Sequence, residues 1–249
     1  MAGKLYMVPT PVGNVGDMTP RAVEVLRAVS LVLAEDTRTS GLLLKRLGVE
    51  TPMRSHHKFN EHGTVDGIIG VLQGGSDVAL ITDAGTPGVS DPGFLLSREC
   101  RRHGIEVDTL PGATALIPAL VNSGLPCERF TFEGFLPQKK GRQSRLDELR
   151  DEPRTMIFYE SPLRLARTLE QMGEAWGTDR EASVSREISK LHGTTVRGTL
   201  GELRDYFVAH EPRGEIVIVV AGRPAVTAAR VDKYACFKHK HVPQDNETN

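Results

Sequence analysis

The residues whose types and spacing are most informative lie in a stretch at 81–93 that carries three glycines, two prolines and two aspartates, Asp83 and Asp91. An apolar run at 78–81 leads directly into this stretch. Glycines at the end of a buried strand let backbone N–H groups approach a ligand without interference from a Cβ atom, and a carboxylate there can bind hydroxyl groups. The pattern therefore predicts a ligand-binding loop.

A second loop of this kind, 8–14, follows the first predicted strand. In an open α/β sheet both loops lie at the carboxyl edge, where they define one crevice. The chain has no G-x-G-x-x-G and no G-x-x-x-x-G-K-[ST] motif, which argues against NAD binding and against an ATPase or GTPase.

Metal ligands are not expected. His56, His57 and His62 have no Cys or Asp partners at ligand spacing, so hydrogen bonds to a substrate or a place in the cleft wall suit them better. The three cysteines show no C-x-x-C spacing, which argues against a disulfide framework and a structural zinc site (Cys100, Cys127 and Cys236). A reducing cytoplasm fits this pattern.

Composition indicates an ordinary globular protein. The chain has 249 residues, of which 39% are hydrophobic and 25% charged, and its formal net charge is −1. Contact with nucleic acid would therefore depend on a local basic face. The N-terminus leads into a short strand without a signal peptide, and no apolar stretch reaches membrane-spanning length, so we expect a cytoplasmic protein without membrane contact.

The elements that must position the two loops alternate regularly. We expect strands at 4–8, 31–34, 53–56, 78–82 and 105–110, with helices at 20–29, 42–47, 65–72, 94–103 and 112–123. This alternation predicts parallel βαβ units in a three-layer sandwich.

A Gly/Pro/charged segment at 124–129 is the best domain boundary, so we expect an N-terminal α/β domain at 1–123 and a C-terminal one at 124–223. The second domain is predicted to contain strands at 130–135, 155–159, 181–185 and 215–221, a basic loop at 139–142, a helix at 163–172 and a hairpin at 192–193. A capping box, Thr199 with Glu202, opens another helix. The polar tail, 224–249, is expected to be disordered.

Six motifs in one order resemble the tetrapyrrole methylase superfamily, and within it the branch of ribosomal small subunit methyltransferases I. They lie at 5–17, 34–38, 82–93, 110–115, 132–137 and 158–161, so the resemblance covers about residues 4–222. It implies two α/β/α sandwich domains with S-adenosylmethionine in the cleft between them, and a homodimer. Longer members of the branch carry an extra small helical domain where this chain has 226–249.

The resemblance also implies a substrate, the ribose 2′-OH of a decoding-region cytidine in 16S rRNA, either as naked RNA or in the 30S subunit. The motifs at 34–38, 60–62, 139–142 and 186–190 resemble the rRNA branch and not the tetrapyrrole branch. The residues implied to hold the cofactor are Val12, Asp83, Ala84, Gly85, Thr86, Val89, Thr114, Ala115, Tyr159 and Ile188.

Basic residues in the second domain form a local cluster suited to phosphates, consisting of Lys139, Lys140, Arg142 and Arg145. The alternative is a solvated charged loop. Together with Arg38 and Asn60, the first three of these residues are the expected RNA contacts.

A ribose 2′-OH is a weak acid, so a carboxylate or an amine must accept or relay its proton. We favour Glu187 with Lys190, which follow a strand of the second domain and should face the cleft. A structural ion pair is the alternative reading. Glu160 is a further candidate. Asp36 and Glu61 are the next candidates, since their loops should open at the same sheet edge.

Three functions remain open at this point. The first is an S-adenosylmethionine-dependent 2′-O-methyltransferase acting on 16S rRNA. The second is a methyltransferase for tetrapyrrole precursors, and the third is a non-catalytic RNA-binding module for ribosome assembly. Salt-sensitive RNA binding separates the first from the second, and methyl transfer separates the first from the third.

Overall fold

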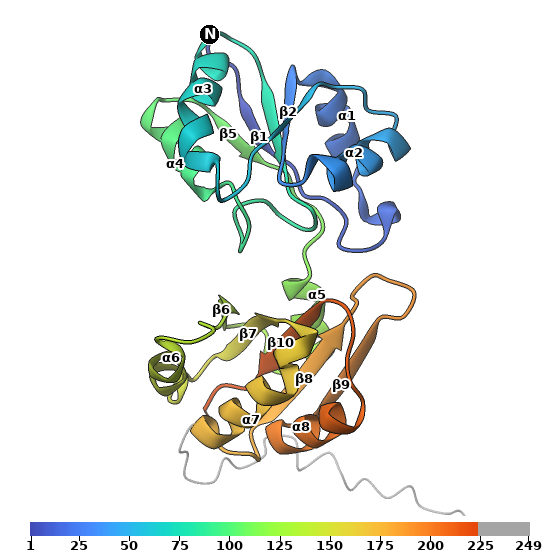
Figure 1. Ribbon diagram of the computed structural model, residues 1–249, viewed down its shortest axis with the longest axis vertical. Coiled ribbons are helices and arrows are strands. Elements are labelled where there is room, and N and C mark those ends of the chain that lie inside the picture. Colours follow the sequence, from blue (N-terminus) through green and yellow to red (C-terminus); the bar gives the residue numbers. More distant parts are fainter. Residues whose placement is uncertain (224–249) are drawn as a thin grey trace, which may run out of the picture.

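The computed structural model describes residues 1–223, so the expected disordered tail at 224–249 lies outside the described residues. Two lobes follow one another along the chain, and each is built on a five-stranded sheet (Figure 1). The first sheet holds β1 to β5 and the second β6 to β10, so the described chain passes between the sheets once. The expected pair of α/β domains is confirmed.

The N-terminal sheet is parallel throughout, as the alternation predicts. Its strand order is β3 (Met53–Ser55), β2 (Leu31–Ala34), β4 (Val78–Ile81), β1 (Leu5–Met7) and β5 (Val107–Thr109). The helices α1 (Pro20–Ala28) and α2 (Thr37–Arg46) cover one face, and α3 (Glu61–Gln73) and α4 (Phe94–Arg102) cover the other (Figure 1). Because all five strands are parallel, their carboxyl ends meet at one edge, where the loops after β1, β2, β4 and β5 gather.

The second sheet is mixed, unlike the parallel first sheet. Its order is β6 (Phe130–Phe135), β7 (Thr155–Glu160), β10 (Ile216–Val220), β8 (Glu181–Arg186) and β9 (Thr194–Thr199). Only β6 and β7 pair in parallel. A short connection joins β8 to β9, and two strands joined so closely must run antiparallel. The expected hairpin at 192–193 is this connection.

Helix α5 (Leu116–Ser123) packs on the second sheet, against β8, β9 and β10. Its buried Ala119 and Leu120 contact Ile157, Val217 and Val219. The helix precedes the boundary expected at residue 124, which was placed at the Gly/Pro segment. By packing it belongs with the C-terminal lobe, because its apolar face covers that sheet.

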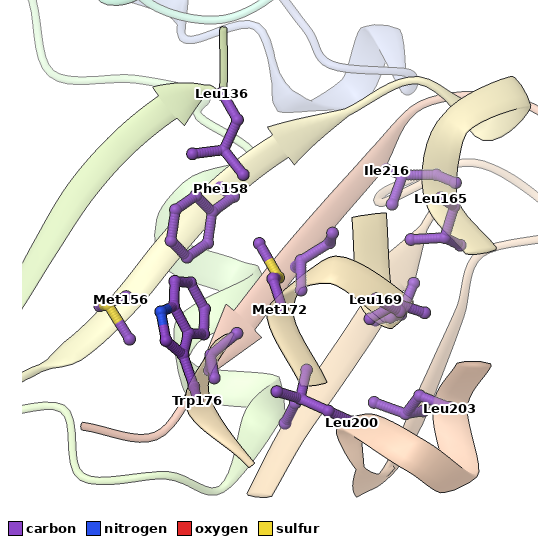
Figure 2. Close-up of a cluster of buried hydrophobic side chains, with 14 of the residues drawn as sticks. Leu136, Met156, Phe158, Leu165, Leu169, Met172, Trp176, Leu200, Leu203 and Ile216 are labelled. Carbon is purple, nitrogen blue, oxygen red and sulfur yellow. The ribbon is translucent and has the colours of Figure 1, made fainter. Parts of the chain in front are cut away.

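The opposite face of the second sheet is covered by α6 (Arg142–Leu149), α7 (Leu165–Trp176) and α8 (Leu200–Ala209), with two short 3-10 helices elsewhere at Val15–Asp17 and Pro162–Arg164. The α8 capping box of Thr199 and Glu202 is present as expected. In the core beneath these helices, the rings of Phe158 and Trp176 lie 5.9 Å apart (Figure 2). Trp176 Nε1 also donates a 2.7 Å hydrogen bond to the carbonyl of Leu146 in α6.

Helix α6 begins at Arg142, the last residue of the expected basic loop at 139–142, and was not among the expected helices. The segment is dominated by charged residues, and only Leu146 and Leu149 are buried. Two apolar residues three positions apart are too few to produce a helical pattern that can be recognised in a sequence. Among residues 1–223, no helix is both long enough and apolar enough to cross a membrane.

Candidate active site

A cavity of about 320 Å³ lies between the two lobes. Its N-terminal wall comes from the loops after β1, β2 and β4, and its C-terminal wall from the ends of β7 and β10. Nine of the ten residues expected to hold a cofactor line it: Val12, Asp83, Ala84, Gly85, Thr86, Val89, Thr114, Ala115 and Tyr159. The tenth, Ile188, packs instead against the apolar cluster beneath α5.

The β4 loop is held to the β1 loop by a pair of backbone hydrogen bonds. Thr10 N donates to Gly85 O and Gly85 N donates to Thr10 O, each over 2.9 Å. Gly85 has φ +82°, a left-handed conformation that residues with a Cβ adopt at a cost. At the far end of the loop Gly93 has φ +130°, and a Cβ there would lie 2.8 Å from Leu80. The glycines therefore set the shape of this wall.

Aromatic side chains close the other wall. The ring of Tyr159 meets Phe132 and Phe135 edge-on, at centroid distances of 5.0 and 5.7 Å. Burial raises the pKa of the Tyr159 hydroxyl. With Val12, Ala115 and Val217 also in the lining, this part of the cavity suits an apolar or planar group.

Five acidic residues line the cavity: Glu35, Asp83, Asp91, Glu160 and Glu215. Burial raises the pKa of Asp91 to about 7, and the charges of Glu35, Asp83 and Glu215 add to this effect. No hydrogen bond within residues 1–223 holds its carboxylate. The pKa of Glu35 is raised by burial and by Asp83, and that of Asp83 by burial and by Asp36.

A second cavity, of about 370 Å³, adjoins the first. Glu35, Ser90 and Asp91 line both of them. The remaining walls of the second cavity come from Lys58, Glu61 and the start of α4 at 92–95. Asp91 therefore lies between two spaces that could each take one of two reacting molecules.

The favoured catalytic pair, Glu187 and Lys190, forms an ion pair outside the lining of both cavities. Lys190 Nζ lies 2.9 Å from Glu187 Oε1, which also accepts a 3.0 Å hydrogen bond from Glu215 N. The hydrogen bond from Lys190 lowers the pKa of Glu187. The stem of Lys190 packs on Gly13, and Ser189 donates to the carboxylate of Asp17, so this turn joins the second lobe to the β1 loop.

The next two catalytic candidates lie apart from each other. Asp36 caps α2 and pairs with Arg38 over 2.7 Å, and the hydrogen bond from Arg38 lowers the pKa of Asp36 to about 2. A carboxylate with so low a pKa is a weak base. Glu61 begins α3 and lines the second cavity only.

The expected RNA contacts divide into exposed and internal residues. Lys139 and Lys140 are exposed, as is Arg38 beside Asp36. Asn60 is used within its own loop, where its Oδ1 accepts a 2.7 Å hydrogen bond from His57 N.

Arg142 serves the interior of the lobe instead of the surface. Its side chain is only 11% exposed and donates 2.7 Å hydrogen bonds to Gln171 and Thr168. Arg145 pairs with Glu133 and Glu148. From the sequence alone, these two arginines cannot be distinguished from Lys139 and Lys140. A sequence does not show which cationic side chains have partners within the fold.

Several lining residues were not among those expected to hold the cofactor: Glu35, Ser90, Asp91, Phe135, Glu160, Glu215, Ile216 and Val217. Asp91 and Glu35 stand in motifs already singled out, and their place at a strand's carboxyl end was the available signal. Ile216 and Val217 carry no such signal, because a β10 residue is apolar whether it faces a cavity or a core. In the described part of the chain, no three His, Cys, Asp or Glu side chains are grouped to hold a metal ion.

Comparisons with known proteins agree with this geometry. Residues 4–204 match the family of Tetrapyrrole (Corrin/Porphyrin) Methylases. A protein named Ribosomal RNA small subunit methyltransferase I from Synechocystis is 49% identical over 221 residues, which cover 88% of this chain and 79% of that relative. Its namesake from Pseudomonas aeruginosa is 50% identical over 224 residues, covering 89% and 79%. The Thermotoga maritima protein of that name is 44% identical and is matched over 99% of its length.

Solved structures share the fold. Uroporphyrin-III C-methyltransferase from Thermus thermophilus matches with a TM-score of 0.61 at 20% identity, covering 89% of this chain and 93% of that one. A cobalt precorrin-4 methyltransferase matches with a TM-score of 0.63 at 16% identity, covering 88% and 94%. At these identities the likeness concerns architecture alone.

Proposed function

The chain belongs to the tetrapyrrole methylase family, and we propose that it is an S-adenosylmethionine-dependent methyltransferase that modifies the ribosomal RNA of the small subunit. The observation that carries this function is the 44–50% identity to proteins named Ribosomal RNA small subunit methyltransferase I, over 221 to 224 residues. The matches cover 88–89% of this chain, so they extend through both lobes.

The cavity between the lobes has the chemistry that the methyl donor requires. Bound S-adenosylmethionine supplies a methyl group on a positively charged sulfur. Carboxylates of Glu35, Asp83 and Glu215 complement positive charge and can accept hydrogen bonds from ribose hydroxyls. The apolar wall around Val12 and Tyr159 suits a purine ring. The β4 loop, with Gly85 in a left-handed conformation, brings backbone groups close to whatever lies there.

We propose further that the acceptor is the ribose 2′-OH of a cytidine in the decoding region of 16S rRNA. The target ribose enters the second cavity, next to the donor. Methyl transfer of this kind breaks the sulfur–carbon bond and forms an oxygen–carbon bond, while the hydroxyl proton must leave to a base. The protein's work is to align the two partners and to take that proton.

Asp91 is the residue we assign to receive the proton. It faces both cavities, so its carboxylate can reach a hydroxyl in the second cavity while the donor fills the first. With a pKa raised to about 7, it is a stronger base than an ordinary aspartate, and about half of it is ionised near neutral pH. The competing assignment is Glu187 with Lys190, whose carboxylate already accepts a hydrogen bond from the lysine.

The proposal also covers the oligomeric state and the cellular compartment. We infer a homodimer in the cytoplasm that contacts RNA through Lys139, Lys140 and Arg38. In support, these three side chains are exposed, and Cys100 and Cys127 are free thiols, as a reducing compartment maintains. Light scattering coupled to size exclusion measures the dimer directly.

Two measurements test the function. Calorimetry should show that S-adenosylmethionine binds without added metal, and that Gly85→Val abolishes the binding. A Cβ at Gly85 would meet only Val12, at 3.7 Å, so the loss arises from the left-handed φ of +82°, which displaces the loop. Mapping of 2′-O-methyl groups should then show one 16S cytidine unmodified in cells that lack the protein and restored by purified enzyme.

The alternatives have different outcomes. Methyl transfer to a tetrapyrrole precursor, with no methyl incorporated into rRNA, would favour the small-molecule enzyme. Binding of rRNA with no methyl transfer under any condition would favour the assembly module. A methyl group found on a base instead of the ribose would overturn the 2′-OH assignment alone.

A further inference from the structure

Helix α4 presents an unusual exposed face. Phe94, its first residue, is 66% exposed, although the buried side of the helix is formed by Leu96 and Cys100. Arg98 and Arg101 follow at four and seven residues from Phe94, which places all three on one side of the helix. A shallow groove of about 350 Å³ runs along this side, lined by Phe94, Ser97, Arg98, Arg101 and Arg102.

The charge on this face is not neutralised by its neighbours. One carboxylate, that of Glu99, pairs with both Arg98 (3.2 Å) and Arg102 (2.8 Å). Arg101 forms no ion pair within residues 1–223. Three guanidinium groups against one carboxylate leave a local excess of positive charge on a chain whose net charge is −1. Such an excess favours a polyanionic partner.

The α4 face is continuous with the proposed reaction site. Phe94 lines both the α4 groove and the second cavity, where Asp91 also lies. The guanidinium of Arg98 sits over the Phe94 ring, 5.5 Å from its centroid. An aromatic ring with a cation beside it matches the combination of base stacking and phosphate neutralisation by which single-stranded RNA is bound.

From these observations we propose that the α4 face holds the single-stranded RNA next to the target nucleotide. One base stacks on Phe94, and the phosphates that follow lie along Arg98 and Arg101, about 10 Å farther along the helix. This inference rests on the proposed function, because it takes the RNA to be the substrate. It adds an RNA surface on the N-terminal lobe, on the face of the sheet opposite to Arg38, whereas Lys139 and Lys140 lie on the other lobe.

The test compares two double variants of equal charge change. Arg98→Ala with Arg101→Ala removes two cations from the α4 face, while Lys45→Ala with Arg46→Ala removes two cations from α2, on the other face of the same sheet. The probe is a fluorescein-labelled oligoribonucleotide of about 12 nucleotides, a length within the range of single-strand site sizes. Its binding is followed by fluorescence anisotropy at several salt concentrations.

The α4 variant should bind the probe at least tenfold more weakly, and its log Kd against log salt should flatten by about 1.4, or about 0.7 for each phosphate that is no longer neutralised. The α2 variant should keep the wild-type slope. Phe94→Ala should weaken binding roughly tenfold without changing the slope, and Phe94→Tyr should restore it. Unchanged affinity and slope in the α4 variant would overturn the assignment.

Two controls separate this result from the function itself. S-adenosylmethionine affinity of every variant, measured by calorimetry, reports whether the fold and the first cavity are intact. Methyl transfer to small subunits by the wild-type protein tests the enzyme function independently of the anisotropy titration. If the α4 variant binds the oligonucleotide normally but fails to bind whole subunits, the partner of this face is a ribosomal protein, and the RNA proposal is rejected.

Discussion

The two lobes place carboxylates at the same cleft but treat them differently. On the N-terminal side, Asp91 has no hydrogen-bonding partner within the described chain, and its pKa is raised to about 7. On the C-terminal side, Glu160 accepts hydrogen bonds from Ser161 N (2.6 Å), Arg164 Nε (2.8 Å) and Thr168 Oγ1 (2.7 Å). Glu187 is likewise held by Lys190.

The difference shows that partners, more than position, decide what a carboxylate can do. A carboxylate without a partner in a partly buried place becomes a stronger base. One with several hydrogen-bond donors is held in place and supports the fold. In this protein the N-terminal loops therefore carry the reactive group, and the C-terminal sheet supplies a rigid wall. Substitutions of Asp91, Glu187 and Glu160 each test this division of roles between the two lobes.

The largest effect is expected on turnover. Asp91→Asn should lower kcat by on the order of 10²–10⁴ because it removes the base, while Glu187→Gln should lower it less than about tenfold. In the wild-type enzyme, the rate should rise with pH through about 7, because the deprotonated carboxylate is the active form, and the variant should lose this rise. Single-turnover transfer from radiolabelled S-adenosylmethionine measures both.

Calorimetry provides the control for this prediction, since the donor should bind Asp91→Asn as it binds the wild type. Carboxyl NMR should independently show one aspartate that titrates near pH 7 and is missing from the variant. If Glu187→Gln lowers kcat more than Asp91→Asn does, the reactive group lies on the C-terminal lobe. The two lobes then do not divide their roles as described.

An intermediate effect is expected on stability in the C-terminal wall. Glu160→Gln should lower the free energy of unfolding by about 1.5–3 kcal/mol, because the residue is only 4% exposed and Arg142 and Arg164 would lose the charge they face. Urea denaturation measures this change. Glu174→Gln, at an exposed position of α7, is the matched control and should stay within about 0.5 kcal/mol of wild type.

The smallest effect is expected from the same Asp91 variant, now on stability. The pKa of Asp91 is higher in the folded protein than its ordinary value of 3.8, so ionisation opposes folding as pH rises from about 4 to 7, and the full penalty remains above that. Asp91→Asn removes the penalty. Its Tm should exceed that of the wild type by a few degrees at about pH 8, and the difference should vanish near about pH 4. A variant less stable than the wild type under the alkaline condition would show that Asp91 has a structural role.

Much of this architecture could be predicted from the sequence. Glycines and prolines after apolar runs located the loops that shape the cavity, and parallel strands require such loops to share one edge. The mixed second sheet and the position of α5 were harder to predict. An apolar helix face indicates that the helix is buried, but it does not indicate against which sheet. The hydrogen-bond partners of individual charged side chains could not be predicted from the sequence. Arg142 and Lys139 look alike in the sequence, yet only folding shows that Thr168 and Gln171 occupy the former.

The single passage of the chain between the lobes carries a mechanical consequence. Thr114 and Ala115 belong to this passage and also line the cavity, so the joint between the lobes is part of the binding surface. A ligand seated there would add to the contact between Ser189 and Asp17 in holding the two lobes together. Because proposed RNA contacts lie on both lobes, filling the cavity should favour RNA binding. Binding should therefore follow an order, with the small molecule first and the RNA second.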